Sequence, residues 1–321
     1  MTSPPAKRQR TEDASITRSS IWYKDGSVVL QAQNTQFRVH WSFLSQNSSF
    51  FRDLENLPQP PEQPTVDGCP VVELPDNADD VKYLLKALYN PAIFHQKALD
   101  FPYIASFIRL GRKYEFKDLF HIALERLTDE NPATLEAFDA LYYPPGLSTH
   151  AGRGQPTRIT DYPGVYHDIL TLARENELRS LLPWAYVCPE IFNGLPRPDG
   201  TTSLLSSTDT QLCIIGRDKL LRAQCSPDKT FGWLVPSESN ANGCKHHEIC
   251  SRSRESIWYS FATSPRIQYA LSTPKFLTRL PFCDHCRERA KEGMTAGRAK
   301  MWEALPSMFG LPPWNELKSE L

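Results

Sequence analysis

The stretch Phe37-Arg38-Val39-His40, followed by Leu44-Ser45 and Ser48-Ser49-Phe50-Phe51, marks a change from strand to helix. Phe37 and Val39 are separated by one polar residue, which places both on one face of a β-strand. After His40 the apolar residues are spaced more widely, at Leu44, Phe50 and Phe51, as they are in a helix. This stretch therefore predicts a β-strand that runs directly into a helix.

The flanking segments extend this pattern. The turn-prone Asp25-Gly26-Ser27 separates Trp22-Tyr23 from the β-prone residues 28–32, which predicts short strands joined by polar turns. The elements predicted downstream are a strand at residues 71–74, a helix that begins near Asp79, and a pair of helices at residues 101–127. The predicted order is thus a hairpin, a helix, a strand and paired helices.

With these motifs in this order, residues 20–128 resemble a BTB/POZ domain. In that family a hairpin ends in F-x-V-H, as at Phe37–His40, and the first helix carries L-[AS]-x-x-S-x-x-F, as at Leu44–Phe51. The resemblance implies an α+β domain at residues 19–130 that acts as a platform for protein–protein assembly. Its implied partner-binding residues here are Asp25, His40, Trp41 and Leu44.

The chain departs from the family pattern at one position. Many BTB/POZ proteins carry Lys or Arg directly after the motif histidine, where this chain has Trp41. A basic residue there can pair with an acidic residue near the hairpin, for which Asp25 is the candidate, and form a charged pocket. Trp41 removes the cation from that pair, and Asp25 also suits an ordinary turn position. Both interpretations of Asp25, as a partner contact and as a turn residue, remain open.

Composition indicates an ordinary globular chain. The 321 residues include 36 Lys and Arg against 37 Asp and Glu, so the net charge of −1 gives no reason to expect nucleic-acid or membrane binding. No apolar run has the length of a membrane-spanning helix, and no apolar secretory segment begins the chain. The expected location is therefore nuclear or cytoplasmic. In that setting the eight cysteines are expected to be reduced, with some of them bound to metal.

Residues 1–18 differ in kind from the rest. They are polar, charged and without periodicity, which predicts a disordered tail. Within it, Lys7, Arg8 and Arg10 follow two prolines and are typical of a short nuclear localisation signal. The alternative is a tail that only increases solubility.

The rest of the sequence predicts helices. They form an extension at residues 131–195 and a Cys-rich, mainly helical region at 196–321. This half resembles the large BTB group of mushroom-forming fungi, which shows a helix with Gly216-Arg217, paired cysteines and the ending W-x-x-L-P-x-x-F-x-L-P-x-W at Trp302–Trp314. The two tryptophans of that ending predict that the C-terminal segment packs onto a hydrophobic core. The resemblance says little about function.

Two cysteine pairs in this half suggest a metal site. Cys283 and Cys286 form a Cys-x-x-Cys turn at the start of a predicted helix, and Cys244 and Cys250 can complete a closed, structural zinc site. A shared ion requires the four sulfurs to lie within about 4 Å of one another. Nearby His246, His247 or His285 could replace a cysteine ligand. Free thiols are the main alternative, and a thiol-redox role is the third.

Three functions fit these features. The first is a non-catalytic interaction protein that self-associates or binds protein partners through the BTB surface. The second is a substrate adaptor of a cullin-type ubiquitin ligase, although no kelch, MATH or ankyrin repeat is visible. The third is a nuclear transcriptional regulator, although tandem zinc fingers are missing from the sequence. The sequence contains no phosphate-binding loop, nucleophile elbow or HExxH motif, so an enzyme is not expected.

Overall fold

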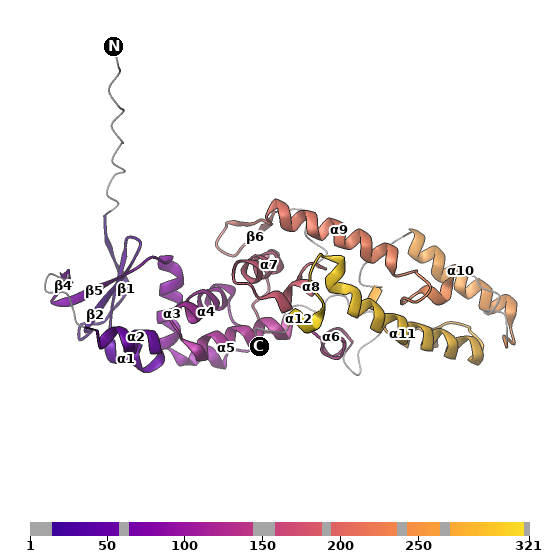
Figure 1. Cartoon of the computed structure of the whole chain (residues 1–321), viewed down its shortest axis with the longest axis horizontal. Helices are drawn as coiled ribbons and strands as arrows, with labels where there is room; N and C mark the ends of the chain where they lie inside the picture. The colour runs from indigo at the N-terminus through magenta and orange to yellow at the C-terminus, as the bar shows by residue number, and fades with distance from the viewer. Residues whose placement is uncertain are drawn as a thin grey trace, which may run out of the picture. The chain divides into compact units, whose positions relative to one another are not determined.

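The computed structural model describes residues 15–57, 64–143, 158–187, 194–235, 243–263 and 270–317, without the side chains of Phe261 and Ala262. Its chain divides into two compact units, one ending at Leu124 and the other beginning at Glu125 (Figure 1). The boundary falls within a single helix, α5 (Lys117–Glu130).

The first unit contains a five-stranded sheet with the order β1-β3-β2-β5-β4. The strands are β1 (Thr17–Trp22), β2 (Val28–Ala32), β3 (Thr35–Val39), β4 (Thr65–Val66) and β5 (Cys69–Leu74). The central strand β2 pairs antiparallel with β3 and parallel with β5, while β1 pairs parallel with β3 at the edge. Strand β1 begins two residues inside the segment that was expected to be a disordered tail.

The β2–β3 hairpin turns at Gln33, which has a positive φ of 50°. The Gln33 side chain accepts a hydrogen bond from the backbone N–H of Ala78, at 3.2 Å. Ala78 is the first residue of α3 (Ala78–Tyr89), so this contact satisfies one of the unpaired N–H groups that every helix has at its start. The hairpin turn and the start of α3 are thereby joined.

The helices of this unit follow the predicted order, with one difference. The structure has α1 (Trp41–Asn47), α2 (Ser49–Glu55), α3, α4 (Phe101–Lys113) and the beginning of α5. The single helix predicted after His40 is wrong, because Ser48 adopts extended backbone angles and separates α1 from α2. Its hydroxyl accepts from the Phe51 N–H and donates to the Tyr114 carbonyl, at 2.6 Å, so Ser48 caps α2 and contacts the end of α4.

Both faces of β2 are buried. Val28 and Leu30 lie on one face, and α3, which contacts β2, buries Leu84 and Leu85. Val29 lies on the other face with Cys69 and Val71 of β5. A continuous apolar run such as Val28-Val29-Leu30 is what a strand buried on both faces requires.

The second unit is mainly helical, as predicted. It contains α6 (Leu135–Tyr142), α7 (Val165–Glu175), α8 (Leu182–Ala185), α9 (Ser207–Ala223), α10 (His247–Thr263), α11 (Asp284–Met308) and α12 (Trp314–Leu317), with the two-residue strands β6 (Leu195–Pro196) and β7 (Thr202–Ser203). In the described ranges of the chain, no helix has both the length and the apolar character needed to cross a bilayer.

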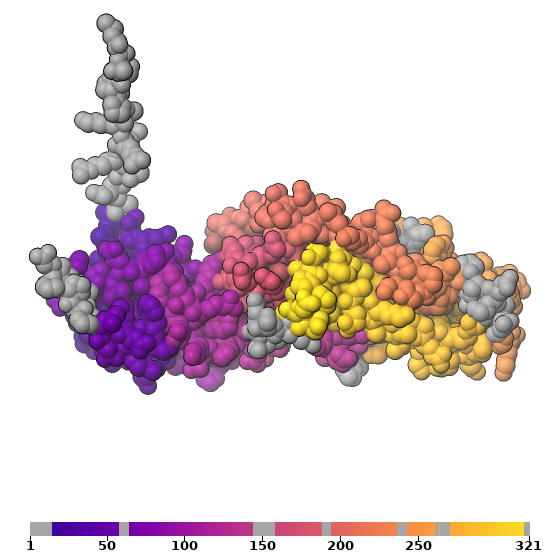
Figure 2. Space-filling model, viewed as in Figure 1, coloured from indigo at the N-terminus to yellow at the C-terminus, as the bar shows by residue number. Residues whose placement is uncertain are grey.

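The C-terminal end of the long helix α11 packs against α9, and Figure 2 shows the yellow end of the chain lying directly against the salmon-coloured α9. A Cβ at Gly216 would lie 2.1 Å from the Phe309 ring, so only glycine permits this approach. Trp302 and Trp314 stack with ring centroids 5.2 Å apart, and both are buried. The two tryptophans therefore pack into the core, as the sequence predicted.

Candidate metal centre

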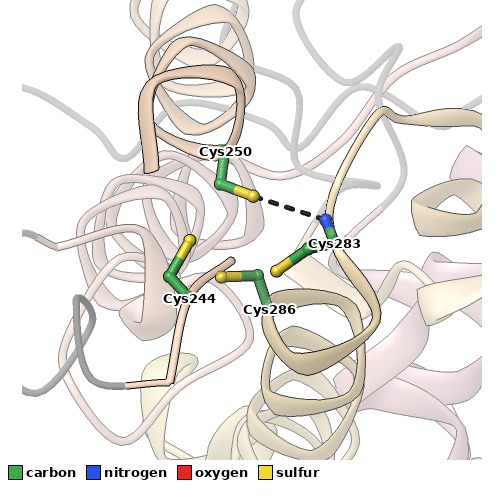
Figure 3. Close-up of side chains that lie close together, drawn as sticks. All are labelled: Cys244, Cys250, Cys283 and Cys286. Atoms are coloured by element: carbon green, nitrogen blue, oxygen red, sulfur yellow. Dashed lines mark hydrogen bonds between the residues drawn. The ribbon is translucent and has the colours of Figure 1, made fainter. Parts of the chain in front are cut away.

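Cys244, Cys250, Cys283 and Cys286 lie together in the second unit. Their sulfur atoms are all within 4.8 Å of one another. This spread is wider than the predicted distance of about 4 Å. Four sulfurs at 2.3 Å from a tetrahedral ion would be about 3.8 Å apart, so the side chains would move inward to bind one. Figure 3 shows the four side chains converging from three segments of the chain. This set could hold a metal ion.

The local structure positions each sulfur. Cys250 is the fourth residue of α10, Cys283 is the N-cap of α11, and Cys286 lies in the first turn of α11. Cys244 follows Gly243, whose φ is +79° and whose Cβ, if present, would lie 2.7 Å from the His285 ring. The left-handed backbone favours glycine at this position, and the exposed His285 ring lies close to it.

The neighbouring histidines do not contribute a ligand. Among the residues that the structure describes, the group of potential ligands at this point consists of the four cysteines. His246, His247 and His285 are exposed, whereas Cys250, Cys283 and Cys286 are buried and Cys244 is partly buried. An ion bound here would have four thiolate ligands and no open position, which is the arrangement of a structural site rather than a catalytic one.

Hydrogen bonds stabilise negative charge on the sulfurs. The backbone N–H of Cys283 donates to Cys250 Sγ at 3.3 Å, and Arg254 Nη2 donates to Cys286 Sγ at 3.6 Å. Arg254 was not singled out from the sequence. It follows Cys250 by four residues on α10, and this spacing, which places both side chains on one helix face, is the signal that could have identified it.

The surroundings shift the pKa values of the thiols in different directions. Burial raises the pKa of Cys283, but N–H groups of Cys286 and Lys245 that donate to its sulfur outweigh burial and lower the pKa to about 6. Burial also raises the pKa of both Cys250 and Cys286 above the usual thiol value. Four adjacent thiols cannot all ionise without a counter-charge, and a divalent cation supplies it.

A separate apolar core surrounds the cysteines. It contains Phe231, Leu234, Leu277, Phe282, Ala290 and Met294, all buried, and Trp233 and Ile257 pack against it. None of the seven cysteines in the described ranges forms a disulfide, and Cys188 lies outside those ranges. The cysteine cluster is therefore the polar centre of a small core built from α10, α11 and the short turns that precede them.

In the first unit, Asp25 and His40 form a second group of predicted site residues. His40 Nε2 lies 3.3 Å from Asp25 Oδ1, and His40 Nδ1 lies 2.9 Å from the Tyr89 hydroxyl. Burial raises the pKa of Tyr89, so its hydroxyl keeps its proton and can donate it to Nδ1. The His40 ring thus lies between the Tyr89 hydroxyl and the Asp25 carboxylate. Asp25 thus has a partner within the unit although Trp41 is not basic.

Comparison with protein families gives one match, which covers most of the first unit and the end of α5. Residues 24–131 match the BTB/POZ domain. This segment is a BTB/POZ domain. The match covers about a third of the chain, and no curated protein matches the chain. The predicted fold class is confirmed, because a BTB/POZ domain with a mixed sheet and helices precedes a mainly helical region.

A BTB/POZ domain implies protein–protein interaction in general, and such domains are typically interaction modules rather than enzymes. Of the predicted partner-binding residues, Asp25 is exposed and His40 and Trp41 are half-buried. Leu44 is fully buried, so the prediction that its side chain meets a partner is corrected: Leu44 packs in the core of the BTB/POZ domain. Leu44 is the buried residue of α1, which packs against α2.

The predicted localisation signal at Lys7, Arg8 and Arg10 lies outside the described residues.

Proposed function

We propose that this protein is a non-catalytic interaction protein that self-associates through its BTB/POZ domain and that a structural Zn²⁺ stabilises its C-terminal half. The observation that carries the first part is the BTB/POZ match at residues 24–131. The observation that carries the second part is the convergence of four cysteine sulfurs within 4.8 Å.

Features of the BTB/POZ surface support self-association. Strand β1 is an edge strand, with one side of its backbone not paired within the sheet. An unpaired strand edge is a template for pairing with another chain. Trp41 begins α1 and is only half-buried, and the exposed side chains of Ile16, next to β1, and Phe50, in α2, add apolar surface to the first unit. Aromatic residues are enriched in protein–protein interfaces.

Light scattering of the full chain at micromolar concentration tests this proposal. The wild-type protein is expected to be at least dimeric, and Trp41→Glu is expected to weaken the association about 10-fold or more, because a charge would be desolvated at the interface. Trp258→Glu is the matched control, since Trp258 is 48% exposed on α10 outside the BTB/POZ domain. A strictly monomeric wild-type protein would remove self-association from the proposal and leave the fold unchanged.

The four cysteine sulfurs favour zinc as the bound ion. Four thiolates in a closed site are typical of structural Zn²⁺, which prefers soft sulfur ligands. Cys250 and Cys283 lie 33 residues apart in the chain, and closing a loop of that length costs a few kcal/mol of chain entropy. Zinc in small peptide sites contributes roughly 10 kcal/mol or more. Ion binding would therefore outweigh the cost of loop closure.

Elemental analysis combined with hydrogen exchange tests the metal. We expect close to one zinc per chain in protein purified without added metal. Removal of zinc by a strong chelator is expected to abolish amide protection in α10 and the first turns of α11, while α4 of the BTB/POZ domain stays protected. Metal-free protein with fully protected α10 and α11 would contradict a structural role of zinc.

Affinity purification of the intact protein followed by mass spectrometry identifies the partners. Recovery of the chain itself or of other proteins without ligase or chromatin components supports a general interaction protein. Recovery of a cullin would instead support a ubiquitin-ligase adaptor, and recovery of chromatin factors would support a transcriptional regulator.

A further inference from the structure

A pocket of about 360 Å³ lies beside the cysteine cluster. It is lined by residues of three segments, among them Trp233, Arg254 of α10, and Cys286, Arg289, Ala290 and Gly293 of α11. Its volume lies within the range of small-ligand sites. Because Ala290 and Gly293 have little or no side chain, the α11 wall leaves space above Trp233.

The charge of this pocket is one-sided. Among the residues that the structure describes, its lining includes two arginines and no Asp or Glu. The surrounding segment, residues 243–300, has eleven Lys and Arg against five Asp and Glu, although the whole chain has nearly equal numbers of each. This stretch of the sequence therefore carries more positive charge than the chain as a whole. Two guanidinium groups on different helices can hold an oxyanion by paired N–H···O hydrogen bonds.

Trp233 supplies an additional donor. Its Nε1–H is buried and has no acceptor among the residues that the structure describes. Buried polar groups in folded proteins nearly always have a hydrogen-bond partner, so an unsatisfied donor in the wall of a pocket indicates a missing acceptor. An oxygen atom of a bound anion can serve as that acceptor.

From these observations we infer that this pocket binds an oxyanion, a phosphate or carboxylate group, between Arg254, Arg289 and the indole N–H of Trp233. Nothing in this inference requires the proposed self-association. The pocket is nevertheless adjacent to the proposed zinc site, because Cys286 belongs to both and Arg254 donates to its sulfur. A zinc ion with four thiolates has a net charge of −2, part of which Arg254 offsets. Arg289 is therefore the residue whose substitution tests the pocket with least effect on the metal ligands.

The test follows the indole N–H signals of the full-length protein, labelled with ¹⁵N at tryptophan, during titration with inorganic phosphate and, separately, acetate. The Trp233 signal is identified by its loss in Trp233→Phe. We expect this signal to shift saturably with at least one of the two anions and not with chloride at the same ionic strength. Saturation by phosphate alone would identify a phosphate site, and saturation by acetate alone a carboxylate site.

Two arginine variants test whether anion binding takes place in this pocket. Arg289→Gln is expected to weaken anion binding at least 10-fold, whereas Arg252→Gln, which changes an exposed arginine on the same helix as Arg254, is expected to leave binding unchanged. If Arg289→Gln does not fold, Arg289→Lys replaces it and is expected to weaken binding by a smaller factor. Zinc content measured on each variant separates this inference from the zinc proposal. Absence of a saturable shift in the wild type, or an equal affinity in Arg289→Gln, would overturn the inference.

Discussion

Individual side chains at the cysteine cluster and at the buried carboxylate of Asp168 have roles that follow directly from their contacts. Cys283 is the N-cap of α11, its N–H donates to Cys250, and its sulfur faces the other three (Figure 3). One residue thus contributes a backbone donor and a sulfur ligand to the same cluster. Its loss affects both the metal and the start of the helix.

For this reason we expect Cys283→Ser to abolish zinc binding and to lower the melting temperature of the second unit. A loss of about 3 kcal/mol corresponds to roughly 10 °C for a unit of this size. Differential scanning calorimetry and elemental analysis measure both effects. Cys225→Ser is the matched control, since Cys225 packs against the same core but does not belong to the cluster. Equal zinc content in the two variants would contradict the proposed ligand set.

Asp168 of α7 is a buried carboxylate that joins α7 to the β6–β7 hairpin. It accepts hydrogen bonds from Arg197 at 2.6 and 2.8 Å, and from the hydroxyls of Ser203 and Tyr162 at 2.6 Å each. Burial raises the pKa of Asp168, but these donors, Arg197 foremost, outweigh it and hold the pKa below its usual value of 3.8. The ionised carboxylate therefore stabilises the folded state.

A carboxyl whose pKa is lowered by folding contributes stability above its unfolded pKa and loses that contribution as the pH falls through its folded pKa. We expect Asp168→Asn to reduce the free energy of unfolding by about 2 kcal/mol at pH 7, since it leaves the half-buried Arg197 without its counter-charge. Urea unfolding at several pH values should show the same difference from wild type at pH 7 and pH 5. The difference should shrink below pH 3.8, and a constant difference down to pH 3 would contradict the role of the charge.

At the scale of elements, α11 depends on glycine at the point where it crosses another segment. A Cβ at Gly297 would lie 2.2 Å from the backbone carbonyl carbon of Lys229 and 2.7 Å from the Thr230 nitrogen. Backbone atoms cannot rotate away as a flexible side chain can. At Gly293, one turn earlier, a Cβ would meet Trp233 Cβ at 3.4 Å and Trp233 Cγ at 3.9 Å, which are ordinary contact distances.

These two glycines provide a matched pair of substitutions. Gly297→Ala is expected to reduce the free energy of unfolding by about 2–3 kcal/mol, because overpacking outweighs the better helix propensity of alanine. Gly293→Ala is expected to increase it by about 0.5–1 kcal/mol, because it gains that propensity without a clash. Thermal unfolding of the full chain measures both. Similar effects of the two substitutions would contradict the close approach of residues 229–230 to α11.

At the scale of the whole molecule, the chain combines a BTB/POZ domain with a second unit that has its own cores. The contacts divide it at residue 124, within α5. The N-terminal basic cluster precedes β1 in the sequence and lies outside the described residues. Its function is tested by substitution.

If an importer binds Lys7, Arg8 and Arg10, replacing all three with alanine is expected to move a fluorescent fusion of the full chain from the nucleus to the cytoplasm. Fluorescence microscopy measures the ratio of the two compartments. Replacing Lys86, an exposed lysine of α3, is the control for loss of surface charge. An unchanged distribution in the triple variant would leave the segment as a solubilising tail.

The sequence by itself determined the features that are encoded locally. The alternation of Phe37 and Val39 and the helical spacing of Val81, Leu84 and Leu85 predict elements found in the structure. The Cys283–Cys286 spacing likewise placed two sulfurs at the start of a helix. Side-chain periodicity and capping depend on neighbours within a few residues, so they can be read directly from the chain.

Only the tertiary structure decided the break at Ser48, the burial of Leu44 and the pocket beside Cys286. The hydrogen bond by which Ser48 caps α2 is local, but its second hydrogen bond reaches the Tyr114 carbonyl 66 residues away, which no local pattern contains. The sulfurs of α10 and α11 likewise meet because the core around Phe231 and Phe282 packs these helices together. Such contacts join distant parts of the chain through the burial of apolar surface, and that burial depends on the complete fold.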